Sequence, residues 1–76
     1  MTLKELNVGK SGRVTAVGGE KTIRRRLLDM GITPRTVVTK RKAAPMGDPI
    51  ELLLRGYALT IRLSDAEKIE VELEEA

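Results

Sequence analysis

Three consecutive arginines, Arg24, Arg25 and Arg26, are the most conspicuous side chains that could bind a partner. Guanidinium groups bind carboxylates and phosphates through paired hydrogen bonds. The run can therefore be a solvated helix face, a contact for an acidic protein surface, or a contact for nucleic-acid phosphates. A second basic set follows at residues 40–42.

The chain lacks the side chains that most catalytic and metal sites use. Its 76 residues include no cysteine and no histidine, which removes thiolate nucleophiles, the commonest general base and the commonest transition-metal ligand. Gly9, Lys10 and Ser11 do not make a phosphate-binding loop, because the upstream glycine of that motif is missing. We therefore expect no enzyme, no catalytic residue and no cofactor, and a protein that acts by binding.

Aromatic side chains are almost absent, and this bears on nucleic acid as a ligand. Tyr57 is the only aromatic residue. Single-stranded nucleic acids are bound by stacking bases on aromatic platforms, and proline-rich peptides dock between aromatic walls. The alternative function, a small basic barrel that binds nucleic acid as a regulatory module, would then depend on phosphate contacts alone.

Charge is divided unevenly along the sequence. Residues 1–63 hold thirteen Lys and Arg against five Asp and Glu (+8), and residues 64–76 hold one Lys against six acids (−5), which gives +3 in total. Such a basic region indicates an anionic partner. Glu70 and Glu72 alternate with apolar residues, so we expect much of the acidic segment to form a strand that can neutralise basic elements in space.

One substantial helix is predicted over residues 20–30. Its apolar stripe recurs with helical spacing at Ile23, Leu27, Leu28 and Met30. Gly31 suits the left-handed position after a helix, with Ile32 placed for the hydrophobic contact of a Schellman end.

Alternation of apolar and polar residues predicts five strands. They cover about residues 12–17, 37–43, 50–54, 57–63 and 69–73. The second strand does not alternate cleanly, so its buried face stays open. Arg55 and Gly56 predict a two-residue hairpin turn. Ser64 and Glu67 have the capping-box spacing of a short helical turn, as residues 2–5 do.

Five short strands in a chain of this size favour a barrel, because closure removes the exposed edges of an open sheet. We expect a mainly β fold with short helices: a small SH3-like five-stranded barrel, with its main helix at about residues 20–30 and a single domain over residues 1–76. The sequence contains no signal peptide and no run of about 18 apolar residues, so we expect a cytoplasmic protein.

Three segments carry a family resemblance: RRLLDMGITP (residues 25–34), APMGDPIELLLRGYALTIR (44–62) and SDAEKIEV (64–71). Together they resemble the FeoA family, the small companion of the bacterial ferrous iron transporter, over about residues 3–73. The resemblance implies an SH3-like barrel and an accessory role in ferrous iron uptake. It also implies binding to the cytoplasmic, G-protein-containing part of a FeoB-type transporter, and recruitment through it to the inner face of the cell membrane.

Two positions depart from the family pattern. After the proline of the Thr33–Thr36 turn the family usually has glycine, whereas this chain has Arg35. In a type II turn this residue has a positive φ, which strains a side chain by about 1 kcal/mol, whereas a type I turn avoids the strain. Lys40 stands where the family often has an aliphatic residue.

The surface predicted to bind the transporter comprises Arg24, Arg25, Leu28, Met46 and Leu53. Leu53 alternates with inward-facing residues, so it either points out of the barrel or lies under the helix. The loop around Met46 is either a recognition surface or a rigid connection, because proline and glycine fix the backbone in both cases.

No specific metal site is expected. Without imidazole or thiolate, ferrous iron would be held by Asp, Glu and water. Glu70, Glu72 and Glu74 lie on the outer face of the predicted last strand and would bind divalent cations only loosely. Asp48 is expected to accept hydrogen bonds from the backbone of its own loop.

Overall fold

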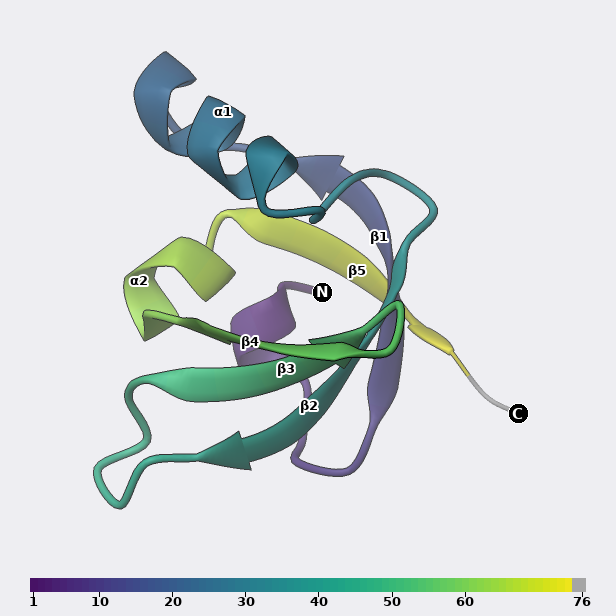
Figure 1. The fold of residues 1–76 in the computed structure, drawn as a ribbon, viewed down its shortest axis with the longest axis vertical. Coiled ribbons are helices and arrows are strands. Elements are labelled where there is room, and N and C mark those ends of the chain that lie inside the picture. Colours follow the sequence, from purple (N-terminus) through teal and green to yellow (C-terminus); the bar gives the residue numbers. More distant parts are fainter. Residues whose placement is uncertain (75–76) are drawn as a thin grey trace.

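The computed structural model describes residues 1–74. In chain order its elements are η1 (Leu3–Glu5), β1 (Ser11–Val17), α1 (Lys21–Asp29), β2 (Val37–Ala43), β3 (Ile50–Leu54), β4 (Tyr57–Ile61), α2 (Leu63–Ala66) and β5 (Ile69–Glu74) (Figure 1). The predicted mainly β fold with one main helix is confirmed. Among the helices of the described chain, none is long and apolar enough to cross a lipid bilayer.

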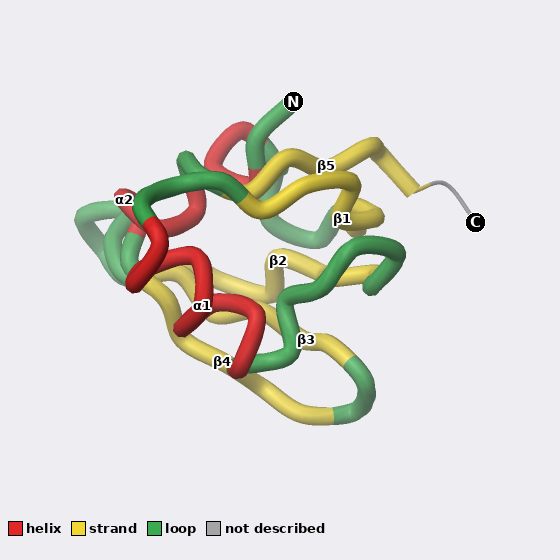
Figure 2. The backbone as a smooth tube through the Cα atoms, turned by 90° about the horizontal axis from the view of Figure 1, so that it is seen from above, coloured by secondary structure: helices red, strands yellow, loops and turns green. Residues whose placement is uncertain are grey.

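The strands form one antiparallel sheet in the order β4-β3-β2-β1-β5. The register shifts after Lys40 in β2 and after Val14 in β1, and such bulges bend a sheet. Figure 2 shows the result, with β1 and β5 on one side of the molecule and β3 and β4 on the other. Within residues 1–74 no ladder joins β4 to β5, and α1 and α2 lie at this open seam (Figures 1 and 2).

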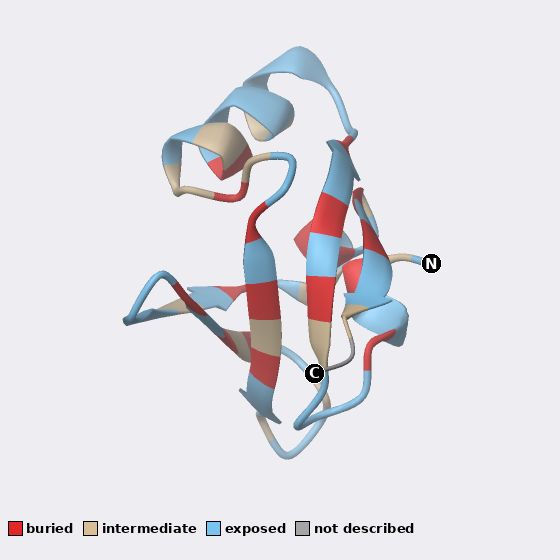
Figure 3. Ribbon diagram, turned by 90° about the vertical axis from the view of Figure 1, so that its right-hand side faces the viewer, coloured by how far each residue is buried: buried red, intermediate tan, exposed pale blue. Residues whose placement is uncertain are grey.

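The core consists of the inward residues of the strands together with leucines from the helical turns. Burial alternates along β3 and β5. Figure 3 shows similar bands of buried and exposed residues on β1 and β2, the two strands that face the viewer. The buried apolar strand residues are Val14, Val17, Val38, Ile50, Leu52, Leu54, Ile61, Ile69 and Val71, and residues in or next to the helices add Leu3, Leu6, Leu27, Ile32 and Ala66. The inward set predicted for β3 is confirmed.

The end of α1 is the predicted Schellman motif. Gly31 has φ +98°, its N–H donates to the carbonyl of Leu28 at 3.0 Å, and the N–H of Ile32 donates to the carbonyl of Leu27 at 3.1 Å. A Cβ at Gly31 would lie 2.5 Å from the hydroxyl oxygen of Tyr57. Both the backbone conformation and the close approach of Tyr57 therefore require glycine.

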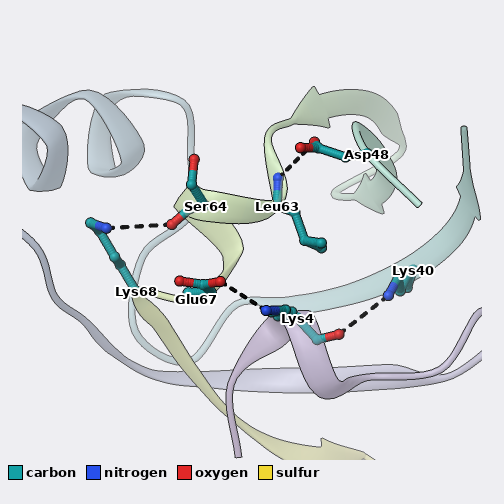
Figure 4. Close-up of polar contacts among 7 residues, drawn as sticks. All are labelled: Lys4, Lys40, Asp48, Leu63, Ser64, Glu67 and Lys68. Atoms are coloured by element: carbon teal, nitrogen blue, oxygen red, sulfur yellow. Dashed lines mark hydrogen bonds and ion pairs between the residues drawn. The ribbon is translucent and has the colours of Figure 1, made fainter. Parts of the chain in front are cut away.

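Two predictions around α2 are wrong. β4 ends at Ile61, so Leu63 is not on that strand but begins α2, and the N-cap is Arg62 rather than Ser64. The reason is a side chain from another loop: Oδ1 of Asp48 accepts a hydrogen bond of 2.9 Å from the N–H of Leu63 (Figure 4). Asp48 thus binds the first amide of α2 rather than an amide of its own loop.

The alternation in the sequence does not show which face of β2 is buried. In the structure the buried face is the one with Val38 and Lys40. Lys40 is only 9% exposed, and its Nζ lies 3.4 Å from the carbonyl oxygen of Lys4 (Figure 4). No ion pair to Lys40 is found in residues 1–74. The methylene stem of Lys40 therefore fills an inward position of the strand while its ammonium reaches one carbonyl.

Candidate partner-binding surface

The three arginines of α1 have different environments. Nε of Arg24 donates to the carbonyl of Val17 at 3.0 Å, and Nη2 of Arg26 lies 2.9 Å from Oδ2 of Asp65. These contacts tie α1 to the end of β1 and to α2. Arg25 is exposed and has no hydrogen bond or ion pair within the described residues. Arg25 is thus the member of the run left free for a partner.

Arg24, Arg25 and Leu28 line one shallow hollow of about 320 Å³ on α1, together with Lys21 and Asp29. Leu28 is half-buried, so it offers an apolar contact between cationic side chains. We call these five residues the α1 surface. Lys21 and Asp29 were not among the predicted residues, although both lie four residues from Arg25 on the helix, a spacing that could have revealed them.

Met46 lies far from this surface. The loop between β2 and β3 that carries it is at the opposite end of the molecule from α1 (Figure 1). Its side chain is 92% exposed. The fold therefore does not join Met46 to Arg25 and Leu28 in one patch, and a contact at Met46 would be a separate one.

Leu53 points out of the barrel, so the interpretation in which the helix covers it is wrong. It pairs with Thr39 of β2 on one side and with Ala58 of β4 on the other, and 38% of its surface is exposed. The five predicted residues thus occupy three places: α1, the β2–β3 loop and the outer face of the sheet.

The Thr33–Thr36 turn has the strained form. Arg35 has φ +77°, and the N–H of Thr36 donates to the carbonyl of Thr33 at 3.1 Å, as in a type II turn. Nη2 of Arg55 lies 3.2 Å from Oγ1 of Thr33 and 3.0 Å from Oγ1 of Thr36. Arg55 and Gly56 both have positive φ, so the predicted hairpin turn is type I′ and Arg55 ties it to the Thr33–Thr36 turn.

The acidic segment neutralises basic groups of the rest of the chain, as predicted. The ion pairs are Glu67 with Lys4 (2.8 Å, Figure 4), Glu74 with Arg13 (2.9 Å), Asp65 with Arg26 (2.9 Å) and Glu70 with the N-terminal amine (3.5 Å). The hydrogen bond from Lys4 lowers the pKa of the Glu67 carboxyl below its ordinary value. The positive charge that remains accessible is therefore carried by groups outside these ion pairs, Arg25 among them.

Carboxylates do not gather into a metal site in the part of the chain that the structure describes. No three Asp or Glu side chains there are placed to hold one ion. Glu70 and Glu74 are turned to the N-terminal amine and to Arg13 instead.

A curved five-stranded antiparallel sheet with one helix between its first two strands defines a small SH3-like domain. The chain belongs to the FeoA domain family, whose model matches residues 1–73. Its relative in Porphyromonas gingivalis, an Fe(2+) transport protein A/Fe(2+) transporter FeoB fusion protein, is 37% identical over 73 residues. That match covers 96% of this chain but only 9% of the fusion protein.

Solved structures agree with this family. The NMR structure of a FeoA-like protein from Clostridium acetobutylicum is 39% identical with a TM-score of 0.92, and the match covers 100% of this chain and 88% of that one. The crystal structure of Stenotrophomonas maltophilia FeoA, in complex with zinc and described as a prokaryotic SH3 domain protein, is 28% identical with a TM-score of 0.83. That match covers 95% of this chain and 89% of that one, so the predicted SH3-like fold is confirmed.

Proposed function

We propose that this protein is a cytoplasmic, non-enzymatic accessory protein of ferrous iron uptake that binds the cytoplasmic, G-protein-containing region of a FeoB-type transporter. The observation that carries the proposal is the Porphyromonas gingivalis relative, in which a domain 37% identical to this chain is joined to FeoB in one polypeptide. Domains joined in one chain are at high effective concentration to each other. A separate chain of the same family would reach FeoB through a binding surface instead.

The α1 surface supports this role. It places Lys21, Arg24 and Arg25 around the half-buried Leu28, and Arg25 has no ion pair within residues 1–74. Cationic groups around an apolar contact fit an acidic protein surface, because charge raises the rate of encounter and the apolar side chain slows dissociation. Binding here would recruit the protein to the inner face of the membrane through the transporter.

A pull-down with the cytoplasmic region of FeoB tests the surface. Arg25→Glu should strongly reduce capture because it reverses the charge, and Leu28→Glu should do so because it disrupts the apolar contact. Lys42→Glu is the matched control, since Lys42 is exposed on β2, outside the α1 surface. Capture that is unchanged in both α1 variants would refute the surface. No capture of the wild-type protein would refute the partner.

The described part of the structure adds no feature that favours the alternative function, binding of nucleic acid. The hydroxyl of Tyr57 donates to the carbonyl of Met30 at 2.6 Å, which ties the single aromatic residue of the sequence to the end of α1, although 42% of its surface is exposed. Four of the acids after residue 64 pair with cations of the remaining chain.

A further inference from the structure

β4 is an edge strand whose outer backbone groups are free. It pairs only with β3, and the pair Leu54 and Tyr57 closes the two-residue turn. Hydrogen-bonded and non-hydrogen-bonded pairs alternate along an antiparallel ladder, so the N–H and C=O groups of Ala58 and Thr60 point away from β3. Both residues are exposed, and within residues 1–74 no turn, loop or side chain bonds to these groups.

The other edge of the sheet is blocked. Thr2 forms a β-bridge with Glu70, and the N–H of Val71 donates to the carbonyl of Met1 at 2.8 Å, so the N-terminal segment lies along β5. β5 also carries several glutamates, whereas β4 has no charged residue and no proline. Proteins normally protect exposed edges with charges, prolines or covering segments. α1 and α2 lie at the seam beside β4 (Figures 1 and 2), but within residues 1–74 neither helix bonds to the outward backbone groups of Ala58 and Thr60. These groups therefore remain available for pairing.

We propose that the free edge of β4 binds an extended segment of another protein by antiparallel strand addition. The added strand would form main-chain hydrogen bonds with the N–H and C=O groups of Ala58 and Thr60, which is how peptides extend exposed sheets elsewhere. This edge contains no residue of the α1 surface. The inference therefore stands independently of the proposed binding to FeoB.

The outer face of the sheet indicates which side chain the segment should carry. Thr39, Leu53 and Ala58 form one cross-strand row, and the next position in this row belongs to the added strand. Ala58 is small, so a large apolar side chain opposite it can cover it and contact Leu53, which is 38% exposed. The segment should therefore be apolar opposite Ala58.

The charged residues at the two ends of β4 indicate which charge the added segment should carry at its amino end. They also argue against a second copy of this chain as the added strand. Arg62 follows β4, is exposed and has no ion pair within residues 1–74. It lines a hollow of about 510 Å³ together with Thr60 and Asp48, and the Asp48 carboxylate accepts the hydrogen bond from the N–H of Leu63. In antiparallel addition the amino end of the segment lies beside Arg62, so acidic residues there complement it. Two copies of β4 paired antiparallel about Leu59 would instead bring Arg62 close to Arg55 of the other copy, which is repulsive.

The probe is a synthetic ten-residue peptide that alternates valine and threonine and carries two glutamates at its amino end. A second peptide with lysines in place of the glutamates is the control. With the wild-type protein labelled with ¹⁵N, the glutamate peptide should shift the amide signals of Ala58 and Thr60 and slow their hydrogen exchange. The lysine peptide should bind about tenfold more weakly, because it places like charges beside Arg62.

Two variants make the test decisive. Thr60→Pro removes an outward N–H without removing a bond to β3, so it should abolish binding. Arg62→Glu lies outside β4, and the side chain of Arg62 makes no capping hydrogen bond, so this variant should fold and reverse the preference between the two peptides. Three results would overturn the proposal: no shifts at Ala58 and Thr60 with millimolar peptide, a peptide preference that Arg62→Glu leaves unchanged, or dimerisation of the free protein through β4.

Discussion

The hydroxyl of Tyr57 donates a hydrogen bond of 2.6 Å to the carbonyl oxygen of Met30, the C-cap residue of α1. β4 thereby holds the end of the helix that carries the α1 surface. The contact also explains why Gly31 must be glycine, because a Cβ there would meet the same hydroxyl.

This contact predicts a coupling between two substitutions. Tyr57→Phe should lower the free energy of unfolding by about 1 kcal/mol, the usual effect of losing one hydrogen bond. Gly31→Ala should destabilise the wild type more than it destabilises Tyr57→Phe, because the phenylalanine ring lacks the atom that the new Cβ would meet. Urea denaturation of the four proteins in this cycle measures the coupling. Equal costs of Gly31→Ala in both backgrounds would show that the approach of Tyr57 does not matter.

The positive φ of Arg35 predicts a stabilising substitution. Arg35→Gly should raise the free energy of unfolding by about 1 kcal/mol, because glycine adopts this conformation without strain. Arg35→Ala is the control, since it removes the same charge and keeps the strain, and should stay within about 0.5 kcal/mol of the wild type. Thermal or urea unfolding that ranks alanine at or above glycine would contradict the type II turn.

Arg26 and Arg25 should differ although they are neighbours on one helix. Arg26→Ala should destabilise by about 1 kcal/mol, because it removes the partner of Asp65, which is almost buried. Arg25→Ala should change stability by less than about 0.5 kcal/mol, since Arg25 is exposed and makes no such contact. The same chemical unfolding assay compares them, and an equal loss in both would refute the anchoring role of Arg26.

The ion pair between Lys4 and Glu67 predicts a dependence on acid. The hydrogen bond lowers the pKa of Glu67 below its ordinary value. The pair therefore stabilises the folded state fully at pH values above the ordinary carboxyl pKa of about 4.3. This stabilisation is lost as pH falls through the lowered pKa of the folded state. In Glu67→Gln the free energy of unfolding should therefore decrease less than in the wild type as the pH is lowered. Glu20→Gln, at an exposed position without an ion pair in residues 1–74, should leave the profile unchanged. Identical profiles for the two variants would contradict the pair.

Much of the fold follows from local patterns, whereas the contacts that complete it do not. The alternation of Ile50, Leu52 and Leu54 and the Gly31–Ile32 helix end act within a few residues, so the sequence reveals them. Alternation failed after Ile61 because Asp48, distant in sequence, binds the first amide of α2.

The candidate site was less predictable for the same reason. That Arg26 is an anchor depends on Asp65, which is 39 residues away. The buried face of β2 could not be predicted because Lys40 has a charged ammonium, which favours exposure, and an apolar stem, which can be buried. The separation of Met46 from the helix likewise depends on the course of the whole sheet.

The proposed binding partner is best tested by measuring the affinity of this protein for the cytoplasmic region of FeoB. A calorimetric titration at physiological salt should show saturable binding that weakens as salt is raised. Arg25→Glu should weaken it by about tenfold or more, and Lys42→Glu should not. Absence of binding to FeoB under these conditions would refute the proposed partner, and binding to duplex DNA instead would favour nucleic acid as the ligand.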